Sequence, residues 1–253
     1  MNNLIIYLIG LIISSVPTGN NSGFDTDAIK NKIDSDIYSA TSTVLVSNSG
    51  CINDKGSIDK FQLVMKDWET DAGTVATFTV AINEINYRIQ SAKVILNSID
   101  RVSLEMEMTK DQLWDSIAIY QPTIQITEIN IDDNENLRIE GMIQVMMGFP
   151  VEIQFQGPIK VEDTVLKYEN VNSVSVFNFS VGNWAGKYIK NVFDVLMDVN
   201  DWDLISAYIM DMDDDYSHYL ENFIRTSEYT VDKGEDDFSL TIILNLSRDV
   251  NMK

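Results

Sequence analysis

Apolar and polar residues alternate along residues 137–156, which is the most regular pattern in the chain. This alternation predicts two long antiparallel strands that meet at Met147-Gly148-Phe149-Pro150, each with one apolar face and one solvated face. Strands of about ten residues are longer than the usual five or six, so the sheet they form has to twist and curl strongly. A third strand is expected over 165–171, after a turn at Glu162-Asp163.

Further strands are expected on both sides of this pair. A short strand is expected at 43–46, and residues 104–108 alternate, with glutamates on one face only. A C-terminal hairpin is expected from Tyr229 to Leu246, with Asp232-Lys233-Gly234 as the start of its turn. Aspartate and glycine favour the backbone angles of tight turns, so this position suits a chain reversal.

The stretch 73–89 also alternates, but its phase changes in the middle. Apolar side chains occupy even positions up to Ile82 and odd positions from Ile85. In a strand such a change moves side chains to the opposite face of the sheet, unless the backbone itself is irregular. We therefore predict a bulge or a bend at Glu84.

Other segments have the 3.6-residue period of a helix. Ile29 and Ile33 predict a short helix, and Thr109 with Gln112 has the spacing of a capping box for a helix that Pro122 ends. The longest apolar stripe predicts a further helix and consists of Trp184, Tyr188, Ile189, Val192, Phe193, Leu196 and Val199. Together these patterns predict an α+β fold, in which a long, strongly curved antiparallel sheet is wrapped around one or two amphipathic helices.

Residues 4–13 contain no charged side chain and are almost entirely apolar. A helix of this length cannot cross the roughly 30 Å of a bilayer core, for which about 20 residues are needed. The length is typical of the central region of a secretory signal, and we predict export to the periplasm, the cell envelope or the extracellular space. The alternative is a buried N-terminal strand or hydrophobic hairpin.

On this interpretation the chain divides into three parts. Residues 1–19 are a signal or membrane-targeting segment, 20–36 are a polar linker with a short helix, and 37–253 are a single α+β domain. The total of 253 residues is enough for one large domain with a sizeable core.

Composition narrows the functions that this domain can have. The chain has 18 Lys and Arg against 39 Asp and Glu, which gives a formal net charge of −21. So strong a negative charge excludes nucleic acid as a direct partner and disfavours adsorption to anionic lipid, but it does not prevent binding of lipid through apolar surface. One Cys and one His exclude an internal disulfide framework and a Cys/His zinc site.

No constellation of residues identifies an enzyme. The chain lacks the G-x-S-x-G, G-x-G-x-x-G and Walker motifs, and we assign no catalytic residue, metal ligand or cofactor. A hydrolase whose carboxylates cannot be singled out stays open as an alternative. Asp211, Asp213 and Asp215 alternate as in the opening of a calcium loop, yet Tyr216 and Asn222 stand where an EF-hand needs Gly and Glu. Only a loose calcium site therefore remains open at this cluster.

The middle of the chain resembles a known family. IQITEINI (124–131) leads through a turn to LRIEGMIQVMMG (137–148), FPVEIQFQGPIKV (149–161) and VLKYENVNSVSV (165–176), and a helix with Trp184 and Ile189 follows. Over about residues 109–200 this order is similar to the LmeA-like family of exported bacterial phospholipid-binding proteins, which are members of the tubular lipid-binding (TULIP) superfamily. The turn at Glu162-Asp163 lacks the glycine usual in that family, and no Leu-Pro opens the helix near Asn183.

The resemblance implies a curved sheet around a helix, an apolar groove for acyl chains between them, and no catalytic residues. A protein of this kind binds or carries lipid outside the cytoplasm and contacts membrane surfaces transiently. The residues expected to line the groove are Ile143, Val145, Met147, Phe149, Val151, Phe155, Trp184, Tyr188, Ile189 and Phe193. The same apolar faces would also form an ordinary closed core. The alternative function is that of an envelope or surface interaction protein with a filled core and no ligand.

Overall fold

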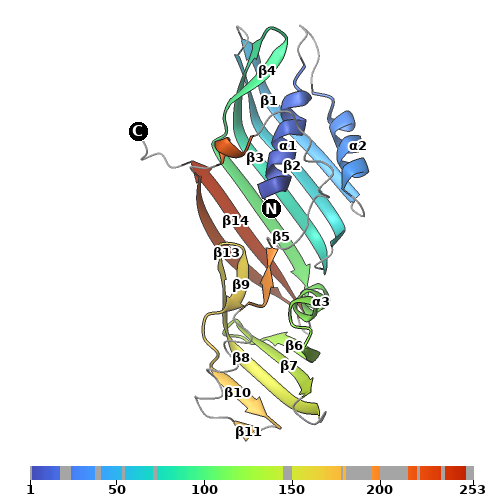
Figure 1. Ribbon diagram of the computed structural model, residues 1–253, viewed down its shortest axis with the longest axis vertical. Helices are drawn as coiled ribbons and strands as arrows, with labels where there is room; N and C mark the ends of the chain where they lie inside the picture. Colours follow the sequence, from blue (N-terminus) through green and yellow to red (C-terminus); the bar gives the residue numbers. More distant parts are fainter. Residues whose placement is uncertain are drawn as a thin grey trace.

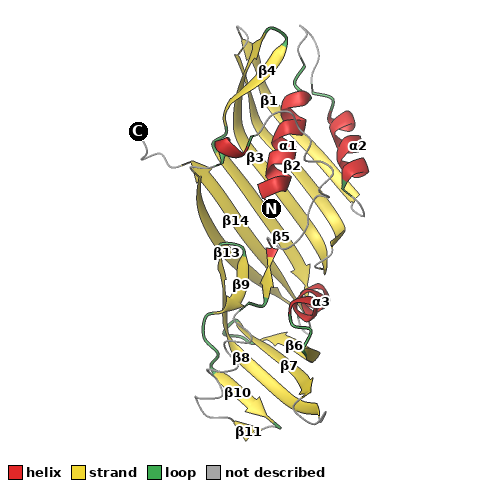
Figure 2. Ribbon diagram, in the orientation of Figure 1, coloured by secondary structure: helices red, strands yellow, loops and turns green. Residues whose placement is uncertain are grey.

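The computed structural model describes residues 2–17, 24–37, 41–52, 55–70, 73–144, 150–177, 179–180, 195–199, 216–220, 223–234 and 237–248. Figure 1 shows an elongated molecule in which a large sheet and a smaller one follow each other along the long axis. Figure 2 shows that strands dominate the described part of the chain. The expected α+β fold with a long, curved antiparallel sheet is confirmed.

The large sheet has seven strands in the order β1-β2-β3-β5-β14-β13, and β4 pairs with the end of β3. Its strands are β1 (Thr41–Ile52), β2 (Lys55–Thr70), β3 (Gly73–Gln90), β4 (Lys93–Ser98), β5 (Arg101–Thr109), β13 (Phe223–Lys233) and β14 (Phe238–Arg248). All neighbours run antiparallel, and the C-terminal hairpin predicted from the sequence is the pair β13 and β14. Because β14 pairs with β5, the chain leaves the large sheet after β5, builds the small sheet, and then returns.

The small sheet contains the two long strands expected on either side of Gly148, while residues 147–149 of the predicted junction lie outside the described residues. Its strands are β6 (Ile124–Ile131), β7 (Asn136–Gln144), β8 (Pro150–Glu162), β9 (Val165–Tyr168), β10 (Ser173–Val176), β11 (Phe179–Ser180) and β12 (Met197–Asp198). The path β11-β10-β8-β7-β6 forms its body, while β9 joins β8 to β12. The third strand expected over 165–171 is shorter than predicted, because the chain leaves β8 after Tyr168 and pairs with it again from Ser173.

Among the described residues the helices are α1 (Asn2–Ser14), α2 (Thr26–Asp36) and α3 (Lys110–Tyr120), and a 3-10 turn lies at Ser217–Tyr219. The capping box of α3 is confirmed: the backbone N–H of Gln112 donates to the Thr109 hydroxyl, and the Gln112 side chain accepts from the backbone N–H of Thr109. Within the described part of the chain, no helix has the length and apolar character needed to cross a membrane. Residues 4–13 belong to α1 and form neither a strand nor a hairpin.

The helix expected to end at Val199 is wrong at its C-terminal end, and residues 181–194 of it lie outside the described residues. Met197–Asp198 form β12, which pairs with β9. The backbone N–H groups of Leu196 and Val199 donate to the carbonyls of Leu166 and Thr164, at 2.9 and 3.0 Å. Here pairing with a neighbouring strand takes the backbone donors that a helix would use internally.

The irregularity predicted in β3 lies at Glu84. This residue has a φ of 54°, and the side chains of Ile82 and Ile85 on either side of it are both buried. β3 pairs with β5 as far as Asn83 and with β4 from Asn86 onward. The phase change in the sequence therefore marks the point at which the strand changes its partner.

One face of the large sheet is continuously apolar. Cross-strand partners line up in three rows over five strands: Val44, Leu63, Val80, Leu104 and Leu244; Val46, Phe61, Ile82, Val102 and Leu246; and Ser42, Met65, Phe78, Met106 and Ile242. All are buried except Val46, which is half-buried, and Ser42 is the one polar member. We refer to these three rows as the apolar face.

Candidate apolar binding site

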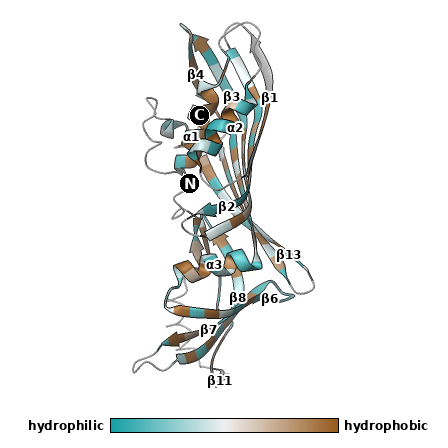
Figure 3. Cartoon of the chain, turned by 90° about the vertical axis from the view of Figure 1, so that its right-hand side faces the viewer, coloured by the Kyte–Doolittle hydropathy of each residue, from teal (hydrophilic) through white to brown (hydrophobic). Residues whose placement is uncertain are grey.

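Helix α1 lies against the apolar face. In Figure 1 it runs in front of β2 and β3, and the side view of Figure 3 places it, with α2, on one side of the large sheet. Between Leu4 and Ile13 every residue except Ile6 is buried. Five of its side chains have no exposed surface at all: Leu4, Ile5, Leu8, Ile9 and Ile12.

This burial is unusual for a helix that lies on a sheet. Such a helix ordinarily keeps a polar face toward water, whereas a helix that is apolar all round is found in the interior. Complete burial of one Leu or Ile side chain contributes about 1.5–3 kcal/mol. The attachment of α1 is therefore dominated by apolar burial, which requires no particular orientation of the buried group.

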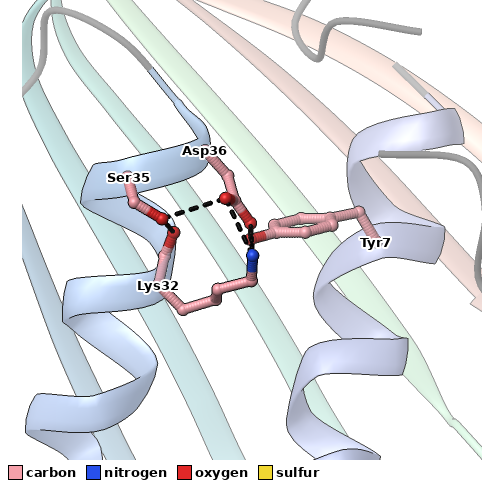
Figure 4. A network of polar contacts seen from close by, with 4 residues as sticks. All are labelled: Tyr7, Lys32, Ser35 and Asp36. Atoms are coloured by element: carbon pink, nitrogen blue, oxygen red, sulfur yellow. Dashed lines mark hydrogen bonds and ion pairs between the residues drawn. The ribbon is translucent and has the colours of Figure 1, made fainter. Parts of the chain in front are cut away.

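A single side-chain hydrogen bond connects α1 to α2 (Figure 4). The Tyr7 hydroxyl donates to the Asp36 carboxylate at 2.7 Å, and the Lys32 ammonium and Ser35 hydroxyl, both on α2, donate to the same carboxylate at 2.9 Å. No other described residue of α1 forms a side-chain hydrogen bond or ion pair outside its own helix and the turn that follows it.

The protonation equilibria of this pair follow from its surroundings. Burial, the hydrogen bond to Asp36 and the negative charge of Asp36 all raise the pKa of Tyr7, so the phenol stays neutral. Burial alone would raise the pKa of Asp36, but the hydrogen bonds from Lys32, Tyr7 and Ser35 outweigh it and hold that pKa below its ordinary value. The hydrogen bond between these helices therefore joins a neutral phenol donor to a charged carboxylate acceptor.

Helix α2 is attached to the sheet by a mixed set of contacts. Its side chains Ile29 and Ile33 are buried, and its N-terminus is capped by the Asp25 carboxylate. The Ser42 hydroxyl of β1 donates to Asp34, whose carboxylate also pairs with Lys30. α2 therefore keeps its own connection to β1, independently of α1.

Helix α3 closes the opposite end of the apolar face. Leu113, Ser116 and Ile117 are its buried residues, and Ser116 lies directly over Gly73 at the start of β3. The C-terminus of α3 is fixed by two hydrogen bonds: Tyr120 donates to the Asp198 carbonyl at 2.6 Å, and Gln121 donates to the Val195 carbonyl at 2.7 Å.

Only part of the groove predicted from the sequence can be located. Ile143 and Val151 are cross-strand partners in β7 and β8, and Phe155 lies farther along β8 on the same face, paired with Ile139. Val151 and Phe155 are buried and Ile143 is half-buried. The other seven candidates, namely Val145, Met147, Phe149, Trp184, Tyr188, Ile189 and Phe193, lie outside the described residues.

The small sheet carries an open groove of about 360 Å³ on its more polar face. Thr127, Glu140, Gly141, Met142, Glu152, Ile153, Gln154 and Ser175 line it. The carboxylate of Glu140 pairs with Arg138. Carboxylates, an amide and hydroxyl groups would lose hydration against an acyl chain without gaining hydrogen bonds, so this groove is not suited to lipid.

The metal hypothesis is not tested by the structure. The acidic cluster at 211–215 lies outside the described residues. Across the described ranges, no group of three or more His, Cys, Asp or Glu side chains is arranged to hold a metal ion.

The sequence did not point to α1 and the apolar face as a site. The alternation in 73–89 and 104–108 was visible, and so was the apolar run 4–13. The sequence does not reveal the register of the strands. The apolar rows can be recognised only when Leu63, Val80 and Leu104 are known to be cross-strand partners. Comparison of the chain with protein-family models, with curated proteins and with solved structures gives no match.

Proposed function

We propose that this protein binds lipid outside the cytoplasm and holds acyl chains on the apolar face of the large sheet. One observation carries the proposal: a helix that lies on an extended apolar surface of the large sheet is attached to the rest of the described structure by almost nothing except apolar contact. A surface of this kind stabilises any elongated apolar group, and each buried methylene of an acyl chain contributes about 0.8 kcal/mol.

Export is part of the same proposal. Residues 4–13 have the length and the uncharged, apolar character of the central region of a secretory signal. Their removal during export would leave the apolar face without α1. An uncovered apolar surface of several strands needs a partner in water, and a lipid supplies one.

The resemblance to exported phospholipid-binding proteins supports the same class of ligand. The strong negative charge of the chain favours a lipid with a zwitterionic headgroup over an anionic one. The proposed ligand is therefore a phospholipid such as phosphatidylcholine or phosphatidylethanolamine, bound through its acyl chains and without chemical conversion.

The test uses the full chain with a site-specific protease sequence introduced between residues 18 and 23. The folded protein is cleaved, mixed with phosphatidylcholine vesicles, separated from them, and examined by native mass spectrometry. We expect a bound phospholipid mass. Protein that remains free of lipid, although peptide 1–18 has dissociated, would contradict the proposed function.

A matched pair of variants locates the binding surface. Leu104→Glu places a charge on the apolar face, whereas Ser103→Glu places the same charge one residue earlier on the opposite face of β5. We expect the first variant to lose lipid and the second to retain it, with circular dichroism confirming that both are folded. Equal lipid binding by the two variants would show that the lipid site does not lie on the apolar face.

A further inference from the structure

We infer that α1 is an intramolecular competitor of the ligand: while α1 is in place the apolar face cannot accept lipid, and the departure of α1 opens it. This inference rests on the proposed lipid-binding function and adds the step that controls access to the site. It makes α1 both a targeting segment and a temporary occupant of the site.

The first argument is the chemical equivalence of the two occupants. The side chains that α1 buries are Leu and Ile with a single Tyr, so α1 presents an apolar, uncharged cylinder to the sheet. A helix of 13 residues is about 20 Å long, which is comparable to an extended long acyl chain. Since the hydrophobic effect is not directional, a face that holds such a cylinder also holds an acyl chain, and the two exclude each other.

The second argument is the way in which α1 is attached. Its only described polar side-chain contact with the rest of the molecule is the bond from Tyr7 to Asp36. The hydroxyls of Ser14 and Ser15 both donate to Leu11, within the helix and its last turn. α1 can therefore leave without breaking an ion pair or a backbone ladder of the sheet.

The third argument is that the rest of the site does not depend on α1. The β strands pair with each other through their own backbones, α2 is bound to β1 through Ser42 and Asp34, and α3 is packed on Gly73. When α1 departs, the frame that surrounds the apolar face stays assembled. The exchange of one apolar occupant for another then requires no refolding of the sheet.

The experiment compares three full-length, uncleaved proteins. Leu8→Asp introduces a charge at a position of α1 with no exposed surface, and Asn3→Asp introduces the same charge at an exposed position of the same helix. Each protein is incubated with phosphatidylcholine vesicles and separated from them. Bound lipid is quantified by native mass spectrometry, and release of α1 is followed by hydrogen–deuterium exchange of residues 2–14.

We expect little lipid on the wild type and on Asn3→Asp, and at least tenfold more on Leu8→Asp, together with loss of exchange protection in α1. Equal uptake by all three proteins would overturn the competition while leaving lipid binding intact. Release of α1 in Leu8→Asp without uptake of lipid would instead overturn the lipid-binding function itself.

The protease-cleaved wild type provides a second measurement that does not depend on a substitution in the core. Lipid should displace the N-terminal peptide in proportion to the amount bound, so that peptide-bound and lipid-bound masses are mutually exclusive. A species that carries both the peptide and a phospholipid would overturn the inference.

Discussion

The hydroxyl of Tyr7 donates a 2.7 Å hydrogen bond to the carboxylate of Asp36, and this bond joins two helices that are otherwise attached to the sheet separately. It is the one place where α1 has a directional contact with the remainder of the described structure. Changes at these two residues therefore report on the position of α1 more directly than changes in the apolar rows do.

Tyr7→Phe removes this bond and leaves the ring in place. Hydrogen bonds to charged groups contribute about 1.5–3 kcal/mol, and Asp36 keeps its contacts with Lys32 and Ser35, so we expect a loss at the lower end of that range. Hydrogen–deuterium exchange should be faster in residues 2–14 and unchanged in β14. Unchanged exchange in α1 would show that the contact does not hold the helix.

The attachment of α1 should weaken in acid. The pKa of Asp36 is depressed in the folded protein, so the stabilisation from its carboxylate is complete above the ordinary aspartate pKa and is lost as the pH falls through the depressed value. We expect exchange of α1 to accelerate relative to β14 as the pH falls below the ordinary aspartate pKa, after correction for intrinsic rates. The Asp36→Asn variant should lack most of this acid dependence, and retention of the full dependence would assign it to another carboxylate.

Leu8→Ala tests the apolar attachment itself. Leu8 has no exposed surface, so truncation leaves a cavity and should lower the free energy of unfolding by about 2–5 kcal/mol. Asn3→Ala, at an exposed position of the same helix, should change it by less than about 0.5 kcal/mol. Urea denaturation measures both, and a Leu8→Ala loss no larger than the control would mean that α1 contributes little to the folded state.

Gly73→Ala should be strongly destabilising at the other end of the face. Gly73 has a φ of 127°, and a Cβ there would overlap the Ser116 hydroxyl of α3. The Ser116 hydroxyl is itself buried and finds no hydrogen-bond partner among the described residues, so Ser116→Ala should be neutral or stabilising by up to about 1 kcal/mol.

The double variant Gly73→Ala/Ser116→Ala separates the two causes. It should recover only the part of the loss that comes from the overlap, because the strained backbone remains. Thermal unfolding of the single and double variants measures the two parts, and complete recovery in the double variant would show that the backbone angle carries no cost.

Much of the fold could be predicted from local patterns. The capping box at Thr109, the phase change at Glu84 and the alternation over 137–144 and 150–156 each depend on residues close together in sequence, and each is found in the structure. The prediction that the apolar stripe forms a helix as far as Val199 was wrong. Its apolar spacing is compatible with a helix, but the backbone N–H of Leu196 donates to the carbonyl of Leu166, which is distant in sequence. Local spacing carries no information on such pairing.

The candidate site depended on information that no local pattern contains. The apolar character of residues 4–13 was plain, but whether this run covers a sheet is decided by what lies opposite it. Likewise, β14 joins the apolar face only by pairing with β5, and this partner could not be inferred from turns or hairpins. For the groove predicted around Phe155, the residues expected on its helical side lie outside the described part of the chain.

The pairing of β14 with β5 also has a kinetic consequence. Ser239 and Thr109 are partners although more than a hundred residues separate them, and everything in the small sheet is synthesised in between. Closing so long a loop is slow and cannot begin until the last strand exists. During synthesis the edge of β5 that faces away from β3 therefore stays unpaired. The chain reaches its native topology only after its C-terminal hairpin has been synthesised.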